Sequence, residues 1–405
     1  MTRARYVDLH ILQPIPASNL NRSDTQEPKT IEYGATTRLF HSSQSWKHVI
    51  RHALEDDLQE YAARTRMVPV VLADRLHVDG WSQDLAAFAA AEVARCATGK
   101  EGGLKTDPAQ QGRTQAMLYL PADTTDRLAA LCHEHRHALE EAAAKAAEAK
   151  SDRTKTAGGK NTSAKTPKAK KSDKDGILPA ADIQQLLTRR TATINLFGRM
   201  LAEIPDGQVD GAVHMAPAFS VHTADLQPDF FTAVEDWPRP GDRGGAHLQT
   251  AFLTTGVLYR YATVNITELL HNLDGDTDQT AHLLGLFTEA FIMELPQGKK
   301  TSTAPHTVPD LVHYVIRDRR PVSYSGAFEQ PVKARPQGGY TLPARAALTA
   351  HARDMDLLVG TRRRVAHGYA CTGQDPVTGL GTRHSGFEDL AQACVKAATG
   401  NWPTS

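Results

Sequence analysis

The chain has 405 residues, 40% of them hydrophobic, and its 46 lysines and arginines balance its 46 aspartates and glutamates. This length allows one large domain with insertions or two to three ordinary domains, and the zero net charge leaves only local charge to indicate a nucleic-acid partner. Four widely spaced cysteines argue against a disulfide framework or a cysteine zinc site, and without an apolar leader or membrane-length run we expect a soluble, cytoplasmic protein.

The first elements are predicted by their hydrophobic periods. Residues 6–12 (YVDLHIL) alternate, which predicts a half-buried strand with Asp8 and His10 on its polar side. Residues 14–29 are rich in Pro, Asn, Ser and Asp and predict a loop. A helix should begin at Ser42 or Ser43, which are good N-cap residues, and continue to about Tyr61. Two alanine-rich helices are expected over 84–97 and 126–150.

A lysine-rich segment follows. Residues 145–174 hold nine lysines and one arginine against Glu148, Asp152 and Asp173, a net charge of +7. Six of the lysines recur every five residues, a period that makes no helical stripe. The segment has too few apolar residues to form a core, so we expect it to be disordered.

The second half of the chain predicts a mixture of strands and helices. Strands are expected over 189–200, 219–223, 256–266 and 310–318, and helices over 278–295, 343–358 and 386–398. The Pro- and Gly-rich stretch 224–255 is either an irregular excursion or a hairpin. Without its insertions the chain has the strand–helix–strand–strand–helix–strand order of α+β, ferredoxin-like domains, which RNA-recognition (RRM) domains share.

One motif points to metal chemistry. HEHRH, residues 133–137, fits H-E-x-x-H, which on a helix places His133 and His137 on one face as zinc ligands with Glu134 as a base. Glu140 stands where the extended metalloprotease pattern has glycine, and the helix leads straight into the lysine-rich segment. A zinc hydrolase is therefore the alternative function, and a solvated helix face is the simpler reading of the same motif.

The start of the predicted helix at residue 42 points instead to an anion. With Trp46 at 0° on a helical wheel, Lys47 lies at about 100°, Arg51 at about 140° and Gln44 at about 160°, which places all three on one polar face. Serine hydroxyls and free N–H groups at the helix start, with these cations, suit phosphate oxygens. From this stretch alone, a solvated basic face is equally compatible.

Further motifs make the chain resemble a known family. They are LNR and Asp24 in 20–24, Tyr33-Gly34, SSQSWK at 42–47, INLFGRML at 194–201, FFTAVEDW at 230–237, GGAHLQTAFLTTGVLYRYATVNI at 244–266 and AFEQPVKA at 327–334. In this order they resemble the CasC family, the backbone subunit of the type I-E CRISPR Cascade complex. The resemblance spans most of the chain and is interrupted mainly at 62–180.

The resemblance implies an architecture of three parts. A ferredoxin-like palm would comprise 1–61, 181–223 and 256–405, with a helical fingers insertion at 62–180 and a thumb loop at 224–255. It also implies a non-catalytic, antiviral protein without a metal or cofactor that oligomerises along the CRISPR guide RNA (crRNA). Its partners would be the guide, target DNA, other copies of itself and the other Cascade subunits, namely the large subunit, the small subunit, the guide-processing endoribonuclease and the guide 5′-end subunit.

The resemblance also assigns residues to the guide. Arg22, Ser42, Gln44, Lys47 and Arg51 would hold its backbone, and Asn21 would shape their loop. Further residues would wedge against bases: Met200, Phe231 and Leu248, with Phe230 beside them. Phosphate contacts carry no sequence information and apolar wedges do not read bases, so such a set would accept guides of any sequence.

Two departures from the family pattern affect these assignments. Ser23 stands where the family is expected to have an acidic residue. The lysine-rich segment is long, and it would either sweep in target DNA by counterion release or act as a solubilising linker. Its candidate DNA contacts are Lys145, Lys150, Lys155, Lys160, Lys165, Lys168, Lys170 and Lys171. A nuclease is a second alternative, for which Asp24 is the nearby acidic candidate.

Overall fold

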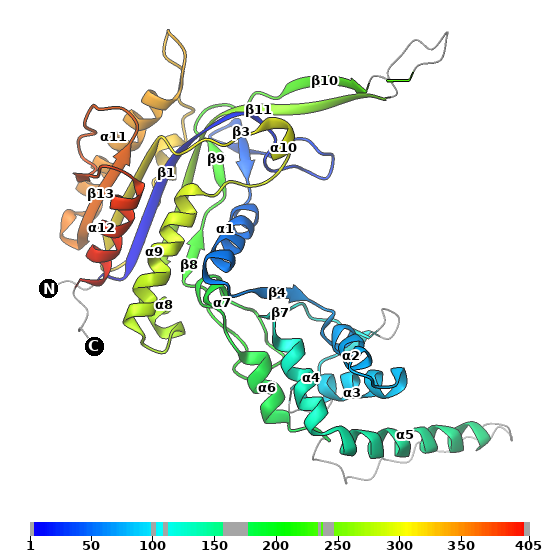
Figure 1. The fold of residues 1–405 in the computed structure, drawn as a ribbon. Coiled ribbons are helices and arrows are strands. Elements are labelled where there is room, and N and C mark those ends of the chain that lie inside the picture. Colours follow the sequence, from blue (N-terminus) through cyan, green and yellow to red (C-terminus); the bar gives the residue numbers. More distant parts are fainter. Residues whose placement is uncertain are drawn as a thin grey trace. The chain divides into compact units, whose positions relative to one another are not determined.

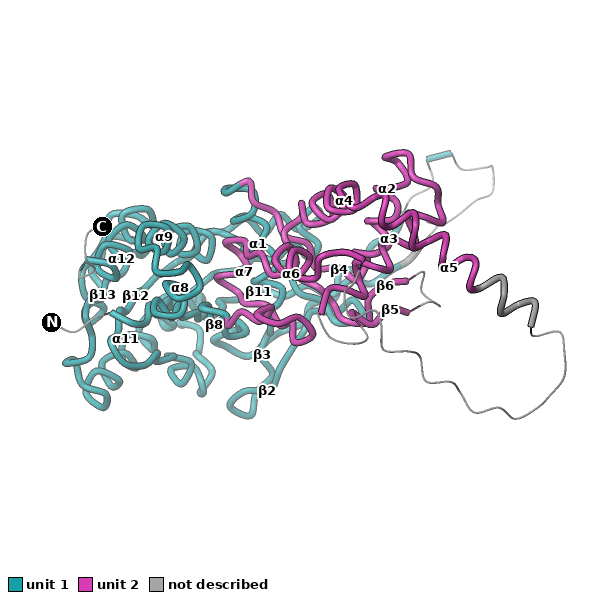
Figure 2. Tube along the Cα trace, turned by 90° about the horizontal axis from the view of Figure 1, so that it is seen from below, with its two compact units in different colours: residues 1–58, 211–405 teal, residues 59–210 magenta. Residues whose placement is uncertain are grey.

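The computed structural model describes residues 4–98, 103–107, 112–156, 177–233, 236–237 and 247–400. The chain forms two compact units, one made of Met1–Leu58 with Gly211–Ser405 and the other of Gln59–Asp210 (Figure 2). Within the described ranges, no helix combines the length and the apolar character that a bilayer crossing requires.

The first unit is built on a large sheet whose central strand is β1 (Tyr6–Ser18). β1 lies antiparallel between β11 (His247–Asn265) and β12 (Leu311–Arg317), with Leu9 opposite both Ala262 and Tyr314 (Figure 1). The strand order is β14-β13-β12-β1-β11-β9-β3-β2. Its outer strands are β13 (Arg364–Cys371), β14 (Thr382–Arg383), β9 (Ala218–Ser220), β3 (Thr36–His41) and β2 (Thr30–Tyr33), and β8 (Val213–Met215) also pairs with β11.

Both faces of β1 are buried, so the prediction of a half-buried strand was wrong. Asp8 and His10 are fully buried under η2 (Ser325–Phe328), α11 (Thr341–Val359) and the segment that precedes them. Asp8 accepts hydrogen bonds from Arg317 Nε at 2.8 Å and from the Tyr261 hydroxyl at 3.0 Å. These partners make the buried carboxyl tolerable, and β1 also runs on through Pro14 to Ser18, where a loop was predicted.

The other face holds a buried arginine. Arg260 of β11 lies 4.0 Å from the ring centroid of Trp46 in α1 (Ser43–Leu58) and 4.8 Å from that of Phe291 in α9 (Thr277–Met293). Its guanidinium donates to Gln13 Oε1 at 3.0 Å and to the carbonyl oxygen of Phe291. Burial lowers the pKa of Arg260 to about 9.

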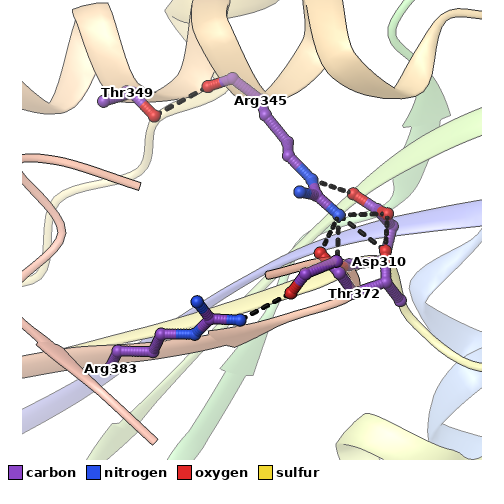
Figure 3. A network of polar contacts seen from close by, with 6 residues as sticks. Asp310, Arg345, Thr349, Thr372 and Arg383 are labelled. Carbon is purple, nitrogen blue, oxygen red and sulfur yellow. Dashed lines mark hydrogen bonds and ion pairs between the residues drawn. The ribbon is translucent and has the colours of Figure 1, made fainter. Parts of the chain in front are cut away.

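Of the remaining helices of this unit, α9, α11 and α12 occur close to the predicted ranges, and the predicted α+β class is confirmed. α8 (Ile266–Asn272) precedes α9, and α12 (Phe387–Thr399) packs beside α9. α10 (Lys300–Thr303) and η3 (Thr361–Arg363) are single turns. Arg345 ties α11 to the sheet, because its Nε and Nη2 donate to Asp310 at 2.5 and 2.6 Å and Nη2 also donates to Thr372 Oγ1 at 2.6 Å (Figure 3).

The stretch at 224–255 forms a hairpin. β10 (Gln227–Ala233) pairs antiparallel with the first part of β11, from Gln227 opposite Leu253 to Ala233 opposite His247. Of the two alternatives left open by the sequence, the described residues therefore support the hairpin.

The second unit combines short strands with helices. β4 (Ala62–Thr65) pairs with β7 (Leu118–Pro121), and β5 (Thr106–Asp107) pairs with β6 (Arg113–Thr114). Its helices are α2 (Val68–Val78), α3 (Gln83–Cys96), α4 (Thr124–Glu134), α5 (Arg136–Thr156), α6 (Ala180–Thr188) and α7 (Ala192–Phe197).

Three predictions within this unit were wrong. Residues 189–200 were expected to form a strand, but Thr191 Oγ1 accepts from Ile194 N at 3.3 Å and caps α7 instead. The helix expected over 126–150 is divided at His135 into α4 and α5, and α5 continues to Thr156, so the first part of the predicted disordered segment is helical. The unit also includes 181–210, which the sequence grouped with the palm, and the division into palm and fingers stays a prediction.

The buried histidines predict how stability depends on pH. Burial lowers the pKa of His41 and of His313 to about 3, well below the value of about 6.5 of an unfolded chain. As the pH falls below about 6.5, the unfolded state binds protons that the folded state excludes, so the free energy of unfolding should decrease between about pH 6.5 and pH 3.

The measurement is urea denaturation at successive pH values. His313→Asn should reduce the proton uptake on unfolding by about one. His137→Asn is the matched control, because His137 is 87% exposed and the same substitution there removes no buried imidazole. Equal slopes for the two variants would contradict the prediction.

Candidate nucleic-acid interface

Ser42 caps the N-terminus of α1, as the sequence predicted. Ser42 Oγ accepts from Ser45 N at 3.3 Å, and the Ser42 carbonyl oxygen accepts from Ser45 Oγ at 2.7 Å. Ser42 N donates to Asn21 Oδ1 at 2.8 Å, which joins the loop before β2 to the start of α1. The sequence placed Asn21 and Ser42 in one site, and the structure brings them into direct contact.

The three predicted polar residues of α1 have different surroundings. Gln44 is exposed beside the cap, and Lys47 is half-buried one turn further along the helix. Arg51 is only 11% exposed, and its Nε lies 3.7 Å from Oε1 of Glu55, which is 2% exposed. Gln44 and Lys47 therefore keep surface on this side of the helix, whereas Arg51 turns toward a carboxylate and offers little surface to a phosphate.

The loop that carries Arg22 is closed on itself. Asn19 Nδ2 donates to the Gln26 carbonyl oxygen at 3.0 Å, and exposed Arg22 donates from Nη1 to Gln26 Oε1 at 2.7 Å. Asp24 is exposed, and its Oδ1 accepts from Thr25 N at 3.1 Å. Closure of the loop presents the guanidinium of Arg22 to solvent next to the helix cap.

The hairpin supplies aromatic surface. Phe230 is 70% exposed and Phe231 is 45% exposed on β10, and they face opposite sides because they are successive residues of a strand. The backbone of Leu248 pairs with Thr232, and its side chain lies outside the described residues. Met200 is 89% exposed and belongs to the second unit. A large exposed apolar side chain of this kind is available to a partner.

The candidate DNA-binding lysines are only partly described. Lys145 lies on α5, where Lys150 and Lys155 are also helical, although the side chains of the latter two are outside the described residues. Lys160, Lys165, Lys168, Lys170 and Lys171 lie wholly outside the described ranges.

The zinc prediction is not supported by the geometry of HEHRH. The motif crosses the break between α4 and α5, so His133 and His137 do not follow one another on a continuous helix. His133 Nδ1 accepts from Trp81 Nε1 at 3.3 Å, and His133 Nε2 lies 3.1 Å from Asp79 Oδ2. Both ring nitrogens of His133 therefore already have partners within the protein. Among the residues that the structure describes, no group of three potential ligands surrounds a metal position.

One cation near this surface was missed by the sequence analysis. Lys299 Nζ lies 5.7 Å from the ring centroid of Phe231, although the two residues are far apart in the chain. The two lysines of the GKK tripeptide at 298–300 were visible in the sequence. Only the fold shows that one of them lies beside Phe231.

Comparisons with known proteins cover nearly the whole chain. A family model described as CT1975-like protein matches residues 7–393. A solved structure titled "CRISPR RNA-guided surveillance complex, pre-nicking" contains a chain that is 38% identical, with a TM-score of 0.84 over 97% of this chain and 100% of that one. A chain in another, titled "CRISPR RNA-guided surveillance complex", is 34% identical with a TM-score of 0.75 and the same coverage. No curated protein matches.

The contact between Asn21 and Ser42 can be tested by substitution. Asn21→Ala removes the acceptor of Ser42 N–H and should lower the free energy of unfolding by about 1 kcal/mol, as measured by urea denaturation. Asn21→Asp keeps an acceptor oxygen and should retain most of that stability. An alanine variant as stable as the wild type would contradict the role of this hydrogen bond.

Proposed function

Because the chain belongs to the CT1975-like protein family and matches chains of CRISPR RNA-guided surveillance complexes over nearly its full length, we propose that it is the guide-RNA-binding backbone subunit of a type I-E complex. The observation that carries the proposal is the 38% identity to a chain of such a complex over 97% of this chain. The proposed role is non-catalytic and cytoplasmic. Copies of the chain bind side by side along the guide and present its segments to invading DNA.

The first unit supports a palm that holds RNA. Its strand order β12-β1-β11-β9, with α1 and α9 in the connections, is compatible with a ferredoxin-like palm. The cap at Ser42, the neighbouring Gln44 and Lys47, and the exposed guanidinium of Arg22 offer hydrogen-bond donors and positive charge to a phosphate backbone.

The hairpin supports a thumb that displaces bases. Phe230 and Phe231 stand exposed on a two-stranded extension, where an apolar ring can insert between bases without reading them. In the proposed assembly, Leu248 and Met200 act in the same way. The other Cascade subunits named above and target DNA are the proposed partners of the assembled backbone.

A direct test uses the isolated chain and single-stranded RNA. We expect it to bind RNAs of unrelated sequence with similar affinity, and the mass of the complex should increase with RNA length as more copies bind. RNA binding confined to one sequence, or one copy bound whatever the RNA length, would contradict the proposal. RNA cleavage that Asp24→Ala abolishes would favour the nuclease alternative instead.

Substitution of Lys47 tests the proposed phosphate contact. Lys47→Glu should weaken RNA binding about tenfold or more, and by a similar factor for every sequence, because phosphates are common to all RNAs. Lys396→Glu on α12 is the matched control with the same change of charge on an exposed site. A loss confined to some sequences would show that Lys47 contacts bases.

The lysine-rich segment gives a separate prediction about DNA. Replacing 157–176 by a Gly/Ser stretch of equal length removes six lysines from each copy of the chain in the assembled complex. Duplex-DNA affinity should then decrease less steeply with salt, because fewer counterions are released on binding. An unchanged salt dependence would indicate a linker.

A further inference from the structure

Three segments far apart in the sequence meet beside the helix cap. The loop at 297–300 packs on the backbone that precedes Asn21, since a Cβ on Gly298 would lie 2.4 Å from the Leu20 carbonyl oxygen and 2.6 Å from that of Asn19. Only glycine permits this approach. The next residue, Lys299, is thereby fixed between the Arg22 loop and β10.

The backbone of Lys299 is held by several hydrogen bonds. It has a left-handed conformation with φ of 49°, which is uncommon for a residue with a Cβ. Its carbonyl oxygen accepts from the backbone N–H groups of Ser302 and Thr303, both at 3.1 Å, and from the Thr303 hydroxyl at 2.9 Å. These bonds, together with the contact at Gly298, determine where the side chain begins.

The ammonium of Lys299 lies over the ring of Phe231, which is proposed to wedge against a base of the guide. A cation over an exposed ring is held only weakly, whereas a hydrogen bond between two charged groups is stronger. A phosphate that arrives with a base against Phe231 would therefore compete successfully for the ammonium. The long, flexible lysine stem allows that change of partner.

We propose that Lys299 is a further guide-binding residue, whose ammonium contacts the backbone phosphate of the nucleotide displaced by Phe231. This inference rests on the proposed function and extends it, because it connects the phosphate contacts at Asn21, Arg22 and Ser42 with the aromatic wedge on β10. The guide would cross from the helix cap to the hairpin over Lys299.

The test compares fluorescently labelled single-stranded RNA of mixed sequence bound to the full-length chain and its variants. Lys299→Met removes the charge and keeps the length of the side chain. We expect about a five- to tenfold weaker affinity, and a slope of log affinity against log salt that is shallower by about 0.7, the value for one phosphate contact on a single strand. Lys299→Arg should restore both quantities.

The matched control is Lys300→Met, because Lys300 is adjacent and exposed and has no assigned part in the contact. It should change affinity and slope less than Lys299→Met does. Weaker binding by Lys299→Met with an unchanged slope would mean that Lys299 only braces β10, and wild-type values of both would also overturn the inference. If the wild-type chain itself does not bind RNA, the proposed function fails as well.

Discussion

The guanidinium of Arg260 is the constraint on which the first unit depends. It is buried between the rings of Trp46 and Phe291, and oxygen atoms of Gln13 and of the end of α9 accept its hydrogen bonds. Removing a charge from water costs several kcal/mol, and these partners offset that cost for the guanidinium. One side chain thereby fixes α1 and α9 against β1 and β11.

This constraint determines the position of the candidate interface. Trp46 is the residue of α1 that covers Arg260, and it lies one helical turn after the cap at Ser42. The cap is tied to Asn21, and the preceding backbone is packed against Gly298. These contacts hold the proposed phosphate-binding groups in place before any ligand arrives, which reduces the ordering that binding would require.

Much of this arrangement could be predicted from the sequence, and the exceptions have physical causes. The apolar spacing of α9 and α12, the serine cap of α1 and the alternation in β12 are local signals, and they indicated these elements correctly. Burial of Asp8 and His10 could not be predicted, because the second layer comes from residues more than 300 positions later. The helix α7 was missed because a threonine cap outweighed an alternating pattern, and the pairing of Arg51 with Glu55 required the actual rotamers. Lys299 could not be identified as a candidate from the sequence, because its position beside Phe231 is a tertiary contact that leaves no hydrophobic periodicity.

The position of β1 has a consequence for synthesis. Tyr6 pairs with Asn265 and with Arg317, so β1 is completed by two strands that are made much later in synthesis. The second unit, by contrast, is continuous from Gln59 to Asp210 and can fold as soon as it leaves the ribosome. Before β11 and β12 have been made, β1 has no partner for either of its edges. A strand with unpaired edges is the kind of segment that aggregates. The nascent chain therefore carries β1 without its neighbouring strands until β11 and β12 have been made, and chaperone protection would matter most during that interval.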